Sequence, residues 1–248
     1  MKSYLNNTNV ISSNSVIMKK KNRIRIYLIV LMGLVLILTN SCKKSDKTNT
    51  EVTDKDGNVY KIVTIGTQVW MAENLKTTKY RNGDLIGTTT PATLDIHLES
   101  TPKYQWAYDG NESNVSTYGR LYTWYAVTDS RNVCPTGWHL PNNTEWTTLT
   151  TYLGGESVAG GKLKETGTTH WISPNTGATN ETGFTALPGG GRDSYGGSFD
   201  VGRNGGWWSS IDYNTNSAWY LYLYNDDNNV NRPSDSKGNG YSVRCLKD

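Results

Sequence analysis

The alternation of hydrophobic and polar positions predicts a β-hairpin just after residue 52. Residues 59–65 alternate in the manner of a half-buried strand, Gly66-Thr67 favours a turn, and residues 68–75 return along the first run. Because successive side chains of a strand point to opposite faces, we expect Val69 and Trp70 on opposite sides of this ribbon.

Two further strands are predicted later in the chain. Residues 218–224 alternate Trp or Leu with Tyr, which is typical of a strand. Residues 241–248 are expected to form the closing strand, with Val243 and Cys245 on the same side. Residues 118–127 are dense in aromatic side chains, and so short a run leaves a strand and a short helix both open.

One helix is predicted from three hydrophobic residues at spacings of three and four: Trp146, Leu149 and Leu153. Asn143 or Thr144 can cap its start, Glu145 lies in the first turn, where a carboxylate suits the helix dipole, and Gly154-Gly155 ends it. Few helices and many aromatic strands together predict an α+β domain that is mostly β, with one or two short helices and long loops, over residues 53–248.

The N-terminal pattern is that of a bacterial lipoprotein signal. Residues 18–25 are basic, and residues 26–38 are apolar but too short to span a bilayer comfortably. The residues Thr-Asn-Ser then precede Cys42, which is expected to carry the lipid. We therefore predict a signal peptide over residues 1–41; an uncleaved anchor and a chance cysteine are the alternatives.

Two consequences follow for the start of the chain and its location. Met18 stands directly before the lysines and is an alternative start, and residues 42–52 are polar and charged, as expected of a tether. The lipid would make the membrane a partner. We expect a bacterial cell-envelope protein anchored in the outer membrane, facing the periplasm or the cell surface.

The charge of the mature chain argues against a nucleic-acid partner. The formal net charge of the whole chain is +3. Residues 1–41 hold six Lys and Arg and no acid, so residues 42–248 carry +3 − 6 = −3. No basic patch remains of the kind that neutralises phosphates.

Cysteines are scarce after Cys42. Cys134 and Cys245 are the other two of the chain's three cysteines. In an exported domain such a pair is more often a disulfide than two thiols, although two buried thiols remain the alternative. A disulfide between Cys134 and Cys245 would close a loop of 111 residues. Such a bridge would stabilise the fold by about 4–5 kcal/mol, less any strain.

Candidate catalytic chemistry is sparse in the sequence. Glu145 and His139 form a close acid–histidine pair, but the helix start accounts for the glutamate. Glu165 and His170 flank a Gly-Thr-Thr loop without a third partner. We therefore predict no catalytic residues and no enzyme activity.

Ligands for a cofactor or metal are also weakly indicated. The triple glycine at residues 189–191 lacks the Lys-Ser or Lys-Thr of a phosphate-binding loop. His139 has no Cys, His or Asp at the spacing of a metal ligand. Asp226 and Asp227 lie in a polar loop where such residues usually form turns, so calcium is possible but unsupported and no cofactor or metal is predicted.

Six motifs occur in a characteristic order: DGNVYKIVTIGTQVWMAENL, YGRLYTWYAV, CPTGWHLPNNTEW, GFTALPGGGRD, WWSS and YSVRCLKD. Together they resemble the Fibrobacter succinogenes major paralogous domain, a family of exported bacterial proteins that are often lipoproteins. The resemblance covers residues 52–248, nearly all of the mature chain.

The resemblance implies a divergent C-type-lectin-like fold. In that fold a cysteine beside the first helix bridges to the last strand, which implies a Cys134–Cys245 disulfide, and Trp207-Trp208-Ser209-Ser210 corresponds to its core strand. The Glu-Pro-Asn, Gln-Pro-Asp and Trp-Asn-Asp calcium motifs of C-type lectins are absent. Formylglycine-generating enzymes share a related fold, but their copper-binding cysteines have no free counterpart if the two cysteines are bridged.

These observations predict an anchored binding or adhesion module whose ligand is a carbohydrate or another surface ligand. Aromatic faces stack on sugar rings, and polar loop side chains bind hydroxyls. The candidate ligand contacts lie in loops expected to gather near the Trp207–Ser210 strand: Arg192, Asp193, Tyr195, Asp212 and Tyr213. The alternative is a structural or assembly lipoprotein that binds another envelope protein.

Overall fold

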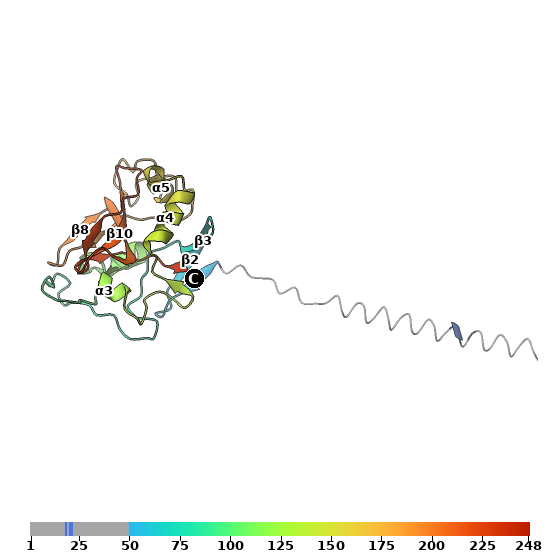
Figure 1. The fold of residues 1–248 in the computed structure, drawn as a ribbon, viewed down its shortest axis with the longest axis horizontal. Coiled ribbons are helices and arrows are strands. Elements are labelled where there is room, and N and C mark those ends of the chain that lie inside the picture. Colours follow the sequence, from blue (N-terminus) through green and yellow to red (C-terminus); the bar gives the residue numbers. More distant parts are fainter. Residues whose placement is uncertain (1–17, 19, 22–49) are drawn as a thin grey trace, which may run out of the picture. The chain divides into compact units, whose positions relative to one another are not determined.

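The computed structural model describes Met18, residues 20–21 and residues 50–248. Apart from Met18 and residues 20–21, the predicted signal peptide lies outside the described residues, as do Cys42 and the tether up to residue 49. Contacts group Asn49–Asp248 into one compact unit (Figure 1). Among the described residues, no helix is long and apolar enough to cross a membrane.

The predicted hairpin belongs to a five-stranded antiparallel sheet with the order β1-β2-β3-β13-β6. Its strands are β1 (Glu51–Thr53), β2 (Val59–Ile65), β3 (Gln68–Met71), β13 (Leu246–Lys247) and β6 (Trp138–His139). The hairpin prediction is confirmed by the pairing of β2 with β3. Trp70 lies in one buried cluster and Val69 packs against another, so the two residues do face opposite sides. Because β1 starts at Glu51, the sheet includes the last two residues assigned to the tether.

The second sheet has the order β11-β10-β9-β7-β12-β5-β4, with β8 paired to β7. Its strands are β4 (Gln105–Trp106), β5 (Leu121–Thr123), β7 (Gly189–Arg192), β8 (Ser198–Val201), β9 (Asn204–Asp212), β10 (Ser217–Tyr224), β11 (Ser234–Ser236) and β12 (Gly240–Tyr241). The predicted strand over residues 218–224 is confirmed as β10, which pairs antiparallel with β9. Trp207 and Trp208 on β9 are fully buried.

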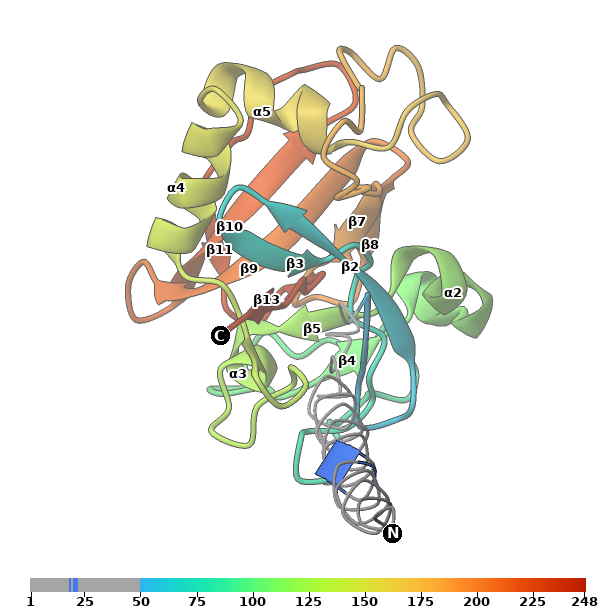
Figure 2. The same ribbon diagram turned by 90° about the vertical axis from the view of Figure 1, so that its right-hand side faces the viewer.

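The helices are short, and strand content (30%) exceeds helix content (17%), which confirms a mostly β domain. Residues 50–248 contain two 3-10 turns, η1 (Tyr108–Gly110) and η2 (Glu112–Asn114), and the helices α2 (Val115–Tyr118), α3 (Trp124–Val127), α4 (Asn143–Tyr152) and α5 (Glu156–Leu163). The undecided aromatic run 118–127 is thus the end of α2, then β5, then α3. Figure 2 shows α4 and α5 beside the long β9–β10 pair.

The predicted helix is confirmed as α4, with a cap one residue earlier than expected. Asn142 is the N-cap: its side chain accepts a hydrogen bond from the backbone N–H of Glu145, and the Glu145 side chain accepts one from the backbone N–H of Asn142. Glu145 is therefore part of a capping box, which satisfies two backbone donors that a helix start would leave free. The helix buries Trp146 and Leu149 against the core.

Helix α5 was not predicted because Gly160 and Gly161 lower helix propensity. Two loops pack so closely against α5 that no side chain fits at either glycine. A Cβ on Gly160 would lie 2.4 Å from the carbonyl oxygen of Asn229, and one on Gly161 would lie 2.4 Å from that of Gly177. The tertiary contacts of α5 therefore outweigh the low helix propensity of its two glycines.

The closing strand is divided between the two sheets. β12 ends at Tyr241 in the second sheet, and β13 begins at Leu246 in the first. Between them, Val243 and Cys245 are fully buried and belong to the same hydrophobic cluster. This agrees with the prediction that the two side chains face the same side. Cys245 forms the disulfide with Cys134, at a Cα–Cα distance of 5.9 Å.

Candidate functional site

A cavity of about 340 Å³ lies where several loops of the second sheet converge. Its lining comes from the segment 96–100, from Tyr125 after the start of α3, and from the turns around residues 194, 216 and 236–238. The lining residues are Ile96, His97, Leu98, Glu99, Ser100, Tyr125, Ser194, Asn216, Ser236 and Gly238. Segments distant in sequence therefore build one concave surface rich in hydrogen-bonding groups.

Backbone hydrogen bonds join these loops into one wall. The N–H of Ile96 donates to the carbonyl of Ser194 at 2.8 Å, and the N–H of Ser194 donates to Oδ1 of Asn239 at 2.9 Å. The N–H of Lys237 donates to the carbonyl of Asn216 at 2.9 Å. Each loop is fixed by its neighbour, so the cavity is formed before any ligand arrives.

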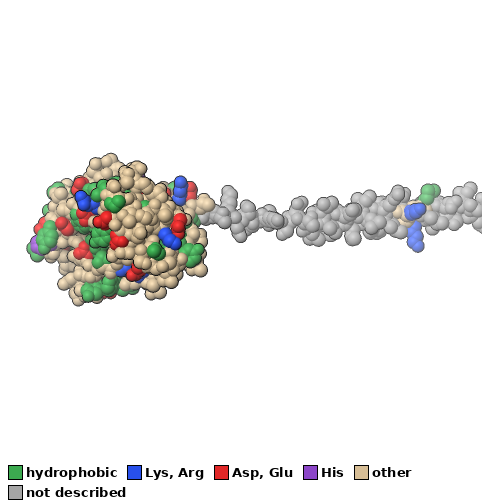
Figure 3. All heavy atoms as spheres, turned by 90° about the horizontal axis from the view of Figure 1, so that it is seen from above, with side chains coloured by type: hydrophobic (Ala, Val, Ile, Leu, Met, Phe, Trp, Pro, Cys, Tyr) green, Lys and Arg blue, Asp and Glu red, His purple; other side chains and the backbone are tan. Residues whose placement is uncertain are grey.

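An exposed aromatic pair stands at the rim. The rings of His97 and Tyr195 are stacked, with centroids 4.8 Å apart and planes 27° apart. Tyr195 is 66% exposed and Leu98 is 86% exposed. Hydrophobic side chains gather beside a histidine at the left end of the domain in Figure 3. Large exposed hydrophobic groups around a polar cavity are typical of a binding surface.

Arg192, the first predicted ligand contact, lies beneath this rim and is only 2% exposed. Its guanidinium donates to the carbonyls of Ala92 (2.8 and 3.0 Å), Leu94 (2.6 Å) and Asp193 (2.8 Å) and lies 4.0 Å from the centre of the Trp106 ring. Burial lowers the pKa of Arg192, with Asp193 and Asp95 opposing the shift. Arg192 thus holds the loop that carries His97.

The other predicted contacts lie around the same cavity without lining it. Asp193 Oδ1 accepts a hydrogen bond from the N–H of Gly197 at 2.8 Å and shapes the turn that presents Tyr195. Asp212 lies 3.7 Å from Nζ of Lys237. Tyr213 is 55% exposed and packs edge-on against Trp219 at 4.8 Å.

Residues 96–100 contribute half of the lining residues, and the sequence did not indicate them as site residues. That region has no regular pattern of hydrophobic positions, so no strand or helix marked it. The one available signal was that His97 lies close to Leu94 and Leu98 in a segment with no predicted element to bury them.

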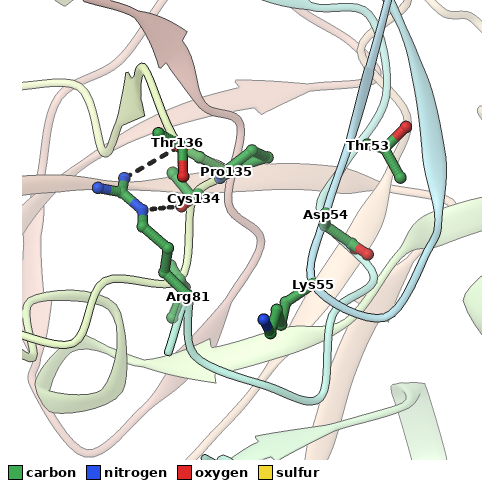
Figure 4. A pocket seen from close by; sticks show the side chains of 8 residues that line it. Thr53, Asp54, Lys55, Arg81, Cys134, Pro135 and Thr136 are labelled. Atoms are coloured by element: carbon green, nitrogen blue, oxygen red, sulfur yellow. Dashed lines mark hydrogen bonds between the residues drawn. The ribbon is translucent and has the colours of Figure 1, made fainter. Parts of the chain in front are cut away.

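A smaller cavity of about 160 Å³ lies beside the disulfide (Figure 4). There Arg81 donates to the carbonyls of Cys134 (3.0 Å), Pro135 (2.9 Å) and Trp138 (2.7 Å). Asp54 accepts from Tyr60 and Asn58. Since these polar groups already bond to the protein, we assign this cavity a structural role.

The two acid–histidine pairs of the sequence are both in contact. His139 Nε2 lies 2.9 Å from Glu145 Oε1, and its Nδ1 lies 2.6 Å from Asp248 Oδ1, a partner that the sequence did not reveal. His170 Nδ1 lies 2.8 Å from Glu165 Oε2. Neither pair lines the described cavities.

The acidic loop considered for calcium is occupied by protein contacts. Asp227 Oδ1 and Oδ2 accept from the backbone and side-chain nitrogens of Asn229. The carbonyl of Asp227 accepts from Nζ of Lys164 at 2.7 Å. Burial lowers the pKa of Lys164 to about 8, with Asp227 and Asp226 opposing the shift. Within the described residues, no group of three or more His, Cys, Asp or Glu could hold a metal ion.

The comparison with protein families agrees with the order of motifs. Residues 63–247 match the Fibrobacter succinogenes major domain. The chain belongs to this family. The match runs from β2 to β13, so the Fibrobacter succinogenes major domain contains the loops of the larger cavity and both bridged cysteines. No curated protein and no solved structure matches the chain.

Proposed function

We propose that the domain is a binding module of the bacterial cell envelope that holds a glycan in the cavity beside His97 and Tyr195. The observation that carries this proposal is the exposed Tyr195 ring, stacked on His97 at the rim of a preformed polar cavity. A sugar ring has an apolar face that packs on an aromatic ring and hydroxyl groups that bond to polar side chains.

The size and chemistry of the cavity support a small polar ligand. Its volume, about 340 Å³, lies at the lower end of the range for ligand sites. Glu99, Ser100, Asn216 and Ser236 supply hydroxyl, amide and carboxylate groups around it. The lining therefore suits one or two sugar units better than a large apolar compound.

The anchor and the fold family form part of the same proposal. The signal pattern and Cys42 support a lipoprotein of the outer membrane. A disulfide between the segment before α4 and the residue directly before β13, together with a buried Trp207-Trp208 strand, supports a C-type-lectin-like fold. The domain would then present its glycan site at the end of a lipid-bound tether.

A glycan array with residues 43–248, tested with and without calcium, examines the proposal. We expect binding to one class of sugar that survives chelation of calcium. Tyr195→Ala should abolish it, because the stacking face is lost. Tyr152→Ala is a matched control, since Tyr152 is 65% exposed and lies on α4, outside the lining.

Other outcomes would redirect the assignment. A blank array with a folded, disulfide-bonded protein would contradict glycan binding and favour an envelope protein as partner. Shortening of a bound oligosaccharide during incubation would contradict a purely binding role. Equal loss of binding in Tyr195→Ala and Tyr152→Ala would place the ligand elsewhere.

A further inference from the structure

The charges around the larger cavity differ from those of a site for acidic sugars. Among the described residues that line it, Glu99 is the carboxylate and none is Lys or Arg. His97 also lines the cavity, but its Nδ1 lies 2.6 Å from Oδ1 of Asp95, whose negative charge offsets any charge on the ring.

Lys237 and Arg192, which lie close to the wall, are directed to the protein. Lys237 Nζ lies 4.4 Å from the centre of the Trp124 ring, donates to the carbonyl of Thr215 at 3.1 Å and lies 3.7 Å from Asp212. Arg192 is buried, and its guanidinium donates to backbone carbonyls. Neither cation is oriented to receive a ligand carboxylate or sulfate.

Glu99 is exposed and keeps capacity to accept hydrogen bonds. Its two oxygens share one protein donor, the hydroxyl of Tyr104, at 3.0 and 3.3 Å. An ionised carboxylate offers about four lone-pair sites, so it can accept from a ligand ammonium as well.

We infer that this cavity selects sugars that carry an amino group over neutral sugars, and neutral sugars over those that carry a carboxylate or sulfate. The inference rests on the proposed glycan site and adds the chemical class of its ligand. An ammonium group gains attraction to Glu99, whereas an anionic group meets repulsion with no cation to offset it.

Calorimetric titration with β-1,4-linked oligomers of glucosamine, glucose and glucuronic acid tests this order at one mildly acidic pH. We expect the glucosamine oligomer to bind about two- to fivefold more tightly than the glucose oligomer, the size of an exposed ion pair. The glucuronic acid oligomer should bind more weakly than both. High salt should reduce these differences.

Glu99→Gln separates the role of this carboxylate from general charge effects. The variant should bind the glucosamine and glucose oligomers with equal affinity, because the preference for the amine depends on the carboxylate of Glu99. Glu181→Gln changes the net charge by the same amount on a side chain outside the cavity and should preserve the preference.

The outcomes distinguish the inference from the proposal beneath it. Glucose binding without any preference for the amine, or tighter binding of the glucuronic acid oligomer, overturns the inference and leaves the glycan site standing. The absence of binding by all three oligomers overturns both. An unchanged amine preference in Glu99→Gln also overturns the inference.

Discussion

The imidazole of His139 bridges two carboxylates: Nε2 lies 2.9 Å from Oε1 of Glu145, and Nδ1 lies 2.6 Å from Oδ1 of Asp248. Glu145 also completes the capping box of α4 with Asn142. One ring therefore joins the start of the first long helix to the residue after β13. We therefore assign the His139 cluster a structural role: it holds the start of α4 to the C-terminal end of β13.

The His139 cluster predicts that the stability of the fold depends on pH. Burial opposes protonation of His139, but its hydrogen bonds to Asp248 and Glu145 outweigh this effect and raise its pKa above the usual 6.5. Because the pKa is higher in the folded state, the stabilisation is fully present below the unfolded pKa and is lost as pH rises through the folded pKa. The difference in unfolding free energy between wild type and His139→Gln should therefore shrink from about pH 5 to about pH 8.

Urea unfolding across that range measures this difference. An NMR titration of the His139 ring should also show a lower pKa in Asp248→Asn, since one of its two carboxylate partners is lost. A difference in unfolding free energy between wild type and His139→Gln that grows with pH would contradict this structural role of His139.

The identity of the helix cap gives a second prediction. Asn142→Ala should reduce the free energy of unfolding by about 1 kcal/mol, because the side-chain acceptor for the N–H of Glu145 disappears. Asn143→Ala is the matched control and should have little effect. Chemical denaturation of both variants checks this, and a larger loss in Asn143→Ala would place the cap one residue later.

The disulfide predicts a large effect on stability. Cys134 and Cys245 are both buried and are 111 residues apart in the sequence. The double variant Cys134→Ala/Cys245→Ala should lose about 4–5 kcal/mol of unfolding free energy, mainly because its unfolded chain is no longer cross-linked. Unfolding of the wild type under reducing conditions should show a loss of similar size. A loss below about 1 kcal/mol in both measurements would contradict a stabilising bridge.

Arg192 should control the shape of the candidate site from below. Lysine keeps the charge but cannot reproduce the bonds to Ala92, Leu94 and Asp193, so Arg192→Lys should cost about 1.5–3 kcal/mol of stability. Limited proteolysis should then cut the loop around His97 faster. Arg203→Lys, on an exposed arginine, is the control. Unchanged proteolysis in Arg192→Lys would refute this positioning role.

The close approach of the same loops leaves no room for a side chain at Gly196. A Cβ there would lie 2.0 Å from the carbonyl oxygen of Thr93, and the backbone φ is +102°. The turn that presents Tyr195 therefore depends on a glycine whose reason is a neighbour about a hundred residues earlier. No pattern local to residues 193–197 could indicate this contact.

The helices and strands also divide into those that a local sequence pattern indicates and those that depend on distant contacts. The hairpin β2–β3, strand β10 and helix α4 were predictable because each has a regular hydrophobic period and local turn or cap residues. β7 was not, because Gly189, Gly190 and Gly191 have no side chains to show a period, although the strand is fully buried between others. α5 escaped prediction for a related reason, since its glycines serve contacts with distant loops.

By itself, the sequence determined the family, the mostly β class, the principal helix and the two cysteines that pair, because these depend on local periodicity and on ordered motifs. The tertiary structure decided which side chains share a surface. It buried Arg192 under a loop, stacked His97 on Tyr195, and brought Ser194, Asn216 and Ser236 to one cavity. Such convergence arises from hydrogen bonds and packing between distant segments, which leave no periodic trace in any one of them.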